Sequence, residues 1–320
     1  MREKDNLLLC YKHEQPDHLP ELFMGMQFCL PSGFLETSLH EQEGYDWFGV
    51  KWRAEIPAAI PDPTAERVLK DICDWREVVK FPDLDNYDWE EAARIDKVAE
   101  LDRENKLFEV IEKEGPFERI QALMGMQEAM VAMMTDQDEF VALAEALTDF
   151  KCRLIDKLAQ YYKPDVINFH DDYGTQRGMM LDPELWREIF KPRLKRIVER
   201  AHSHGMIFEL HCCGLIEEIV PDFVEIGIDS LNCMPINDIP RLKRETNGQL
   251  CFFTGFDQQK YDLADRCGTL TEDALRAEIR EFITACAEGG NYIPSCRPNE
   301  WWVNQVIFDE LNKLRTTLYK

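Results

Sequence analysis

The second half of the chain alternates short apolar segments with segments of helical character, and this alternation constrains the fold more than any other feature. The predicted strands are 206–211, 229–234, 250–253 and 291–295. A helix is predicted to begin at Asp182, with a proline in its first turn, and to end at Gly205. Parallel strands need long crossover connections, which are usually helices, so the pattern predicts repeated β/α units.

The first half is less regular, but it supplies the remaining units that a barrel needs. A long helix is predicted over 136–162, because Phe140, Leu143 and Leu147 recur at helical spacing. The predicted strands are 22–28, 48–52, 107–111 and 165–170; helical additions are predicted at 1–20 and within 57–104, and a polar loop over 254–270. About eight strands, each followed by helical sequence, predict an α/β protein with a (β/α)8 TIM barrel and N-terminal helical additions.

Composition narrows the classes of partner. The 320 residues carry 61 acidic and 37 basic side chains, for a formal charge of −24. This balance argues against binding to nucleic acid or to an anionic membrane, and no run of about 18 apolar residues predicts a membrane span. No signal peptide is evident, and the 11 cysteines form no short disulfide framework. We expect a cytoplasmic protein in which residues 1–320 form one domain.

The stretch Glu-Leu-His-Cys-Cys-Gly at 209–214 is the strongest candidate for chemistry. His211 and Cys213 lie two residues apart, so on an extended chain their side chains point to the same side. Cys296, also at the end of a predicted strand, could supply a third ligand. One imidazole and two thiolates suit tetrahedral zinc and leave a fourth position open. The alternative is that these cysteines are small apolar core residues.

Other polar residues follow predicted strands, at the barrel end where catalytic groups gather. Glu209 shares the face of His211 and is predicted either to support the metal or to pair with a barrel cation. Asp172 and Tyr173 are predicted to orient substrate or to deliver a proton, with capping of the turn before Gly174 as the alternative. The candidates for substrate contacts are Met24, Met26, Gln27, Phe28, His170 and Asn232. Core packing is the alternative for the methionines and the phenylalanine.

Five segments carry a resemblance to a known superfamily. They are Gly115-Pro116-Phe117, residues 171–176, residues 181–186, Lys191-Pro192-Arg193 and His211-Cys212-Cys213-Gly214. They resemble the uroporphyrinogen decarboxylase superfamily, and within it the zinc- and corrinoid-dependent methyltransferases. The resemblance implies a (β/α)8 barrel with zinc held by His211, Cys213 and Cys296 at its carboxyl-end mouth. It also implies methyl transfer involving a corrinoid (cobalamin) carried on a separate corrinoid-binding protein.

The resemblance implies several activities, in an order of preference. We expect a methyl group to move from a small methoxylated compound, for example an aromatic methyl ether, to the cob(I)alamin of the partner, with zinc as Lewis acid on the ether oxygen. A methylcorrinoid:thiol methyltransferase with a zinc-activated thiolate is the close alternative. A tetrapyrrole decarboxylase comes third, because residues 24–28 lack an arginine to clamp substrate carboxylates. A zinc-stabilised barrel without activity comes fourth.

Overall fold

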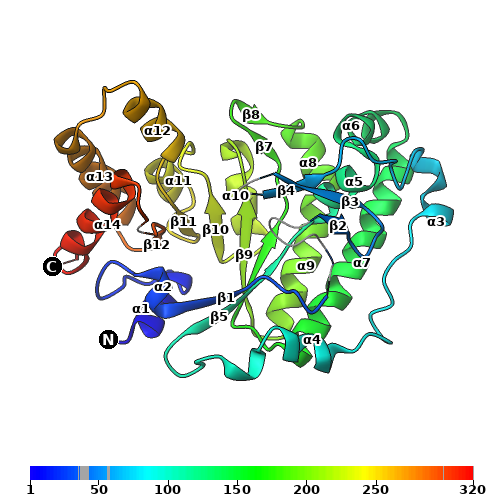
Figure 1. The fold of residues 1–320 in the computed structure, drawn as a ribbon, viewed down its shortest axis with the longest axis horizontal. Coiled ribbons are helices and arrows are strands. Elements are labelled where there is room, and N and C mark those ends of the chain that lie inside the picture. Colours follow the sequence, from blue (N-terminus) through cyan, green and yellow to red (C-terminus); the bar gives the residue numbers. More distant parts are fainter. Residues whose placement is uncertain (35, 37–42, 56–57, 298, 320) are drawn as a thin grey trace.

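Seven parallel strands form the main sheet of the computed structural model, which describes residues 1–34, 36, 43–55, 58–297 and 299–319. In sheet order they are β1 (Met26–Cys29), β5 (Leu107–Glu112), β6 (Val166–His170), β9 (Ile207–Cys212), β10 (Ser230–Cys233), β11 (Cys251–Thr254) and β12 (Tyr292–Pro294). The sheet is curled around an interior (Figure 1). The predicted β/α barrel architecture is therefore confirmed, with seven strands in the main sheet of the described residues.

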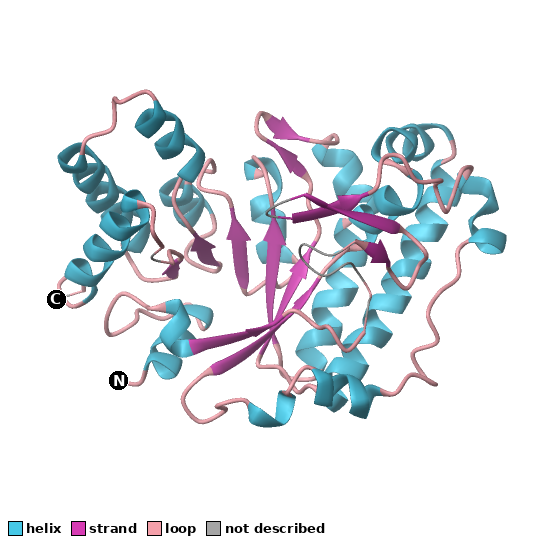
Figure 2. Ribbon diagram, in the orientation of Figure 1, coloured by secondary structure: helices cyan, strands magenta, loops and turns pink. Residues whose placement is uncertain are grey.

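Helices connect the strands and cover the outer face of the sheet (Figure 2). The α-helices are α1 (Glu3–Tyr11), α2 (Leu22–Gly25), α3 (Trp75–Val78), α4 (Trp89–Ile95), α5 (Pro116–Met124), α6 (Met126–Thr135), α7 (Gln137–Tyr161), α8 (Pro183–Ile189), α9 (Lys191–Ser203), α10 (Val220–Glu225), α11 (Ile239–Glu245), α12 (Gln258–Arg266), α13 (Glu272–Ala287) and α14 (Trp302–Arg315). Short 3-10 helices are η1 (Ile72–Asp74), η2 (Val98–Glu100) and η3 (Glu217–Ile219). Within the described ranges, none of the helices combines the length and apolar character needed to cross a bilayer.

The first helix fills part of the interior of the sheet. Leu7 and Cys10 of α1 are fully buried in one cluster with Leu107 of β5 and Ile293 of β12. The Cys10 thiol lies 3.9 Å from the backbone carbonyl oxygen of Tyr292. Because α1 also packs on α2, which leads directly into β1, these two helices bridge the edge strands of the sheet.

One predicted barrel strand, 48–52, is wrong. The side chain of Asp46 accepts hydrogen bonds from the backbone N–H groups of Phe48 and Val50 at 2.9 Å, and Gly49 has a φ of 81°. These contacts make a turn rather than a strand. The chain becomes extended only afterwards, in β3 (Lys51–Glu55), which pairs with β2 (Gly44–Tyr45) and β4 (Ala58–Pro61) in a separate three-stranded antiparallel sheet, here called the antiparallel sheet.

Two other predicted elements differ from the structure. The predicted strand at 22–28 begins as the helix α2, in which Leu22 and Gly25 are buried at a spacing of three while Met24 is 62% exposed. The predicted loop at 254–270 contains α12. Asp257 caps this helix by accepting a hydrogen bond from the N–H of Lys260.

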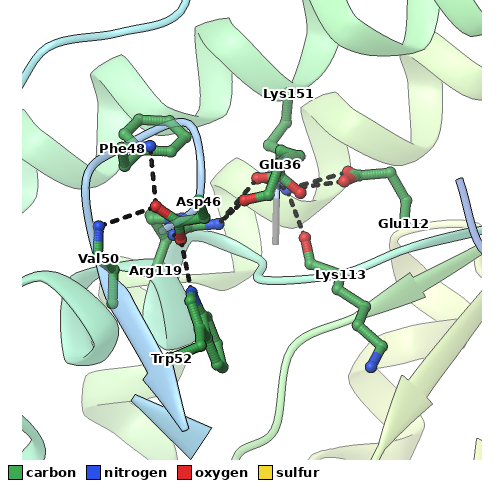
Figure 3. A network of polar contacts seen from close by, with 9 residues as sticks. All are labelled: Glu36, Asp46, Phe48, Val50, Trp52, Glu112, Lys113, Arg119 and Lys151. Carbon is green, nitrogen blue, oxygen red and sulfur yellow. Dashed lines mark hydrogen bonds and ion pairs between the residues drawn. The ribbon is translucent and has the colours of Figure 1, made fainter. Parts of the chain in front are cut away.

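A buried network of charged side chains joins the antiparallel sheet to α5 and α7 (Figure 3). Arg119 Nη1 lies 2.6 Å from Asp46 Oδ2. Lys151 Nζ lies 2.8 Å from Glu36 Oε1 and 2.9 Å from Glu112 Oε1. These five side chains, here called the Arg119–Lys151 network, are at most 3% exposed.

The network holds three carboxyl groups and two cations. Burial raises the pKa of Glu112 well above its usual value, and the charge of Glu36 raises it further. A proton on Glu112 leaves two carboxylates to balance two cations. Asp46 also accepts a hydrogen bond from the indole N–H of Trp52 at 2.9 Å. The network therefore fixes the position of Trp52 on the antiparallel sheet.

Candidate metal centre and the cavity beside it

The loops that follow β6 and β9 lie backbone against backbone, and the candidate centre is built on this contact. A Cβ atom at Gly214 would lie 2.1 Å from the carbonyl carbon of Gly174, and one at Gly174 would lie 2.7 Å from the carbonyl oxygen of Cys213. Gly214 also has a φ of 86°, a conformation that side chains disfavour. A larger residue at either position would separate the loops, so the two glycines allow Asp172 to approach Cys213.

Three potential metal ligands meet at this contact. One ligand atom each from Asp172, His211 and Cys213 lies within 4.8 Å of the others, and all three residues are partly buried. His211 Nε2 and Cys213 Sγ are 3.3 Å apart. Ligand bonds of roughly 2.0 Å to nitrogen and 2.3 Å to sulfur at a tetrahedral angle place the two atoms about 3.5 Å apart. The spacing of this predicted pair therefore fits a shared metal ion.

Neighbouring strands hold the ring of His211 in place. In the sheet register His211 of β9 lies between His170 of β6 and Asn232 of β10. The ring of His170 stacks on that of His211, with centroids 4.1 Å apart. An amide oxygen only accepts, so His211 Nδ1–H donates a hydrogen bond to Asn232 Oδ1 at 2.8 Å, while Nε2 faces Cys213 Sγ. The structure thus places His170 and Asn232, both predicted to touch substrate, against the candidate ligand.

Replacing Asn232 by alanine is expected to weaken zinc binding roughly 10- to 100-fold, because the imidazole loses the partner that fixes its tautomer. Competition with a chromophoric chelator measures the affinity. Asn232→Asp keeps an oxygen acceptor and should retain most of it. Equal zinc affinities in wild type and Asn232→Ala would show that this hydrogen bond does not contribute to zinc binding by His211.

Asp172 holds the backbone and the thiol of Cys213. Its Oδ1 accepts the N–H of Cys213 at 2.6 Å. Burial, together with the nearby carboxylate of Asp172, raises the pKa of the Cys213 thiol to about 12. In the protein alone this sulfur is therefore a thiol at neutral pH. A divalent cation would displace that proton, because thiolates are the form that binds metals.

Cys296 lies outside this group. It follows β12, which is separated from β9 by β10 and β11. Its side chain is 7% exposed, and its Sγ lies 3.7 Å from the carbonyl oxygen of Asn304. Burial raises the pKa of the thiol to about 12. The structure therefore groups His211 and Cys213 with Asp172, whereas Cys296 as a ligand stays a prediction.

The side chain of Tyr173 is packed in the protein core. Its side chain is 1% exposed, its ring stacks on Phe117, and its hydroxyl donates to Asp171 Oδ2 at 2.7 Å. Asp171 also accepts the N–H groups of Phe117 and Glu118 at the start of α5. Asp171 therefore caps the start of α5 and not the turn before Gly174, Asp172 lies with the candidate ligands, and Tyr173 lies in the core with its hydroxyl bonded to Asp171.

A polar layer lies inside the barrel beneath His211. Glu209 is fully buried and accepts hydrogen bonds from Asn168 Nδ2 at 2.8 Å, Ser230 Oγ at 2.7 Å and the hydroxyl of Tyr11 at 3.2 Å. Neutral donors therefore surround this carboxyl, and the predicted pairing with a cation is not what the structure shows. Glu109, 1% exposed, lies close enough for the charge of Glu209 to raise its pKa, which burial already places well above the usual value.

Glu109→Gln is expected to make stability less dependent on pH. Because the folded pKa of Glu109 is raised, its contribution to stability is complete below its usual pKa and is lost as the pH rises through the folded value. The free energy of unfolding of wild type should therefore fall between pH 5 and pH 8. The variant should match wild type at pH 5 and exceed it at pH 8 by roughly 1–3 kcal/mol, the range for an unsatisfied buried polar group. Urea denaturation at both pH values measures this, and parallel pH curves would contradict it.

The predicted substrate contacts near the first strand have other partners. Met24 points outward on α2, and Met26 is buried in the interior cluster around α1. Gln27 exchanges hydrogen bonds with the backbone of Asp102. Phe28 packs against Phe23, with ring centroids 5.8 Å apart. The structure places none of these four side chains in the group of potential ligands.

A cavity of about 350 Å³ lies between α5 and the antiparallel sheet. Its lining includes Trp52, Ile60, Glu114, Glu118, Gln121 and Met126. Glu118 links this cavity to the chain that carries Asp172, because its backbone N–H donates to the neighbouring Asp171 at 3.0 Å. A larger hollow of about 820 Å³ by α6 and α8 is lined mainly by methionine and leucine and contains none of the candidate ligands.

Charged groups near this cavity were missed by the sequence reasoning. Lys113, Glu114 and Glu118 follow β5 directly, at the same end of the sheet as Asp172 and His211. Figure 3 shows the amino group of Lys113 pointing away from the Arg119–Lys151 network. Burial lowers the pKa of Lys113, while the carboxylates of Glu114, Glu118 and Asp172 raise it. The sequence feature that marks these residues is their position directly after a strand, just before or within the segment that begins with Gly115-Pro116-Phe117.

A sequence family and a solved methyltransferase share this architecture. The sequence model of the family described as Uroporphyrinogen decarboxylase (URO-D) matches residues 76–293. A solved methyltransferase from Methanosarcina mazei is 16% identical, with a TM-score of 0.61, over 98% of this chain and 99% of that chain. A xylose isomerase-like TIM barrel protein from Mycobacterium smegmatis, in complex with magnesium, is 14% identical with a TM-score of 0.32, over 69% and 78% of the two chains. No curated protein matches the sequence.

Proposed function

We propose, since the chain belongs to the uroporphyrinogen decarboxylase family, that it is a zinc-dependent methyltransferase of that family. It would move a methyl group from a small methoxylated compound to the cob(I)alamin of a partner corrinoid protein. The observation that carries the proposal is the grouping of His211, Cys213 and Asp172 where the loops after β6 and β9 meet. The resemblance of the motif at 211–214, and the likeness in fold to the methyltransferase from Methanosarcina mazei, support the same reaction class.

Zinc fits the donors that the chain offers. Imidazole nitrogen, thiolate sulfur and carboxylate oxygen are its usual ligands, and three protein ligands leave a position for substrate. His211, Cys213 and Asp172 would hold the ion. When bound, zinc would supply Lewis acidity toward the ether oxygen of the donor.

Contacts within the protein hold the three candidate ligands in place. Asn232 keeps the proton on Nδ1 of His211, so that Nε2 offers its lone pair. Asp172 fixes the backbone of Cys213, and the contact of Gly174 with Gly214 fixes both loops. These contacts set the ligand atoms before any ion binds, which reduces the conformational entropy lost on binding.

The adjacent cavity favours a small donor over a tetrapyrrole. Its volume of about 350 Å³ is near the lower limit for ligand pockets. Its lining holds two glutamates, Glu114 and Glu118, and one cation, Arg67, whereas a tetracarboxylated porphyrinogen needs several cationic clamps. These features support transfer from a small ether and speak against decarboxylation of a porphyrinogen.

The direct test is methyl transfer in the presence of zinc. Chemically reduced cob(I)alamin is mixed with the protein and methoxybenzene, and the absorbance change to methylcobalamin is followed. The proposal expects product with the ether donor and none without protein. Consumption of methylcobalamin by an added thiol, with no reaction of the ether, would instead assign the thiol methyltransferase activity. Absence of both reactions in zinc-loaded protein would refute the proposal.

A further inference from the structure

The cavity between α5 and the antiparallel sheet lacks a catalytic assignment, and Glu118 lines it. Glu118 lies in the first turn of α5, and its N–H is held by Asp171, whose own side chain is fully buried. This contact fixes the position of the helix start. The Glu118 side chain is partly buried and lines the cavity, and its charge contributes to the raised pKa of the Cys213 thiol.

The groups around Glu118 favour its protonated form. Burial raises its pKa well above the usual value, and the carboxylates of Glu114, Asp172 and Asp171 raise it further, while Lys113 lowers it. A protonated carboxyl can donate a hydrogen bond to an ether oxygen and then release its proton. Neither Tyr173, which is committed to Asp171 in the core, nor Asp172, which holds the N–H of Cys213, is placed as well for this task.

We propose that the cavity between α5 and the antiparallel sheet binds the methyl donor, a small uncharged methyl ether, and that Glu118 delivers the proton to its departing oxygen. This inference rests on the proposed function. Trp52, Ile60 and Met126 supply an apolar wall for the organic part of the donor, and Trp52 is held by its hydrogen bond to Asp46.

The step balances without further reagents. The cobalt(I) centre of the corrinoid contributes the electron pair of the new cobalt–carbon bond, and the carbon–oxygen bond of the ether breaks. The electron pair of that bond stays on the oxygen, and the proton of Glu118 converts it to a hydroxyl group. Glu118 is left as a carboxylate, which recovers a proton from solvent.

The proton is needed only when the departing oxygen is a strong base, and this gives the test. With free cob(I)alamin and zinc-loaded protein, Glu118→Gln should transfer the methyl group of methoxybenzene at least about 100-fold more slowly than wild type. With 4-nitromethoxybenzene, whose phenolate is a weak base, the loss should be less than about 5-fold. Glu118→Asp, which keeps an acid on a shorter side chain, should lie between wild type and Glu118→Gln with methoxybenzene.

Controls separate this inference from the proposed function. Glu188→Gln makes the same exchange at an exposed position on α8 and should behave as wild type. Thermal denaturation and zinc content confirm that each variant is folded and loaded. Equal losses with both donors, or no loss with either, would overturn the role of Glu118 while leaving the methyltransferase intact. Failure of wild type with both donors would overturn the proposed function and this inference with it.

Discussion

Replacing Arg119 by methionine is expected to lower the free energy of unfolding by about 3–5 kcal/mol. The side chain is fully buried, bridges Asp46 and Glu36, and lies over the ring of Phe48. Methionine fills a similar volume, but it leaves the buried carboxylate of Asp46 without its cation and leaves Glu36 with Lys151 alone. The cost is that of uncompensated charges in a medium of low polarity, which is why it exceeds the effect of a lost surface pair.

Urea denaturation followed by circular dichroism measures this loss. The matched control is Arg196→Met, which removes an exposed arginine paired with Glu145 and Asp149 and should cost less than about 1 kcal/mol. Asp46 also accepts the hydrogen bond of the Trp52 indole, so Arg119→Met should loosen the antiparallel sheet. Trp52 should then be more accessible to quenchers of tryptophan fluorescence. Similar losses in the two variants would show that the network stabilises no more than a surface pair.

Exchanging Cys213 for serine is expected to lower methyl transfer at least about 100-fold, because a hydroxyl group binds zinc far more weakly than a thiolate. The exchange changes one atom and should leave the fold intact. Transfer from methoxybenzene to free cob(I)alamin measures the effect.

Cys267→Ser, at an exposed position after α12, is the matched control and should retain full activity. If Cys213→Ser transferred methyl groups as fast as the control, the sulfur at 213 would have no part in the reaction.

The strands of the second half could be predicted from sequence because apolar runs there are bounded by glycine and polar residues. The predicted strand 206–211 is β9 at Ile207–Cys212, and 250–253 is β11 at Cys251–Thr254. The prediction at 48–52 failed because one side chain, Asp46, closes a turn through two backbone bonds. Apolar composition does not reveal such a contact.

Only the part of the candidate site that depends on residue spacing along one strand could be predicted from the sequence. His211 and Cys213 lie together because they occupy one face of the chain after one strand. The contact of Asn232 with His211 depends on the register between β9 and β10, which the sequence does not contain. Whether Cys296 reaches His211 and Cys213 depends on the distance across the sheet from β12 to β9, which spacing along the sequence does not show. Glu118 was missed because the antiparallel sheet, which forms the other wall of its cavity, was not predicted.

The zinc content of the purified protein tests the central claim most directly. After dialysis against zinc and removal of excess ion, wild type should hold about one zinc per chain, and His211→Ala less than about a tenth of that. If Asp172 is the third ligand, Cys296→Ser should keep its zinc. Loss of zinc from Cys296→Ser would instead identify Cys296 as the third ligand. Wild type without zinc, or His211→Ala with as much zinc as wild type, would contradict the account.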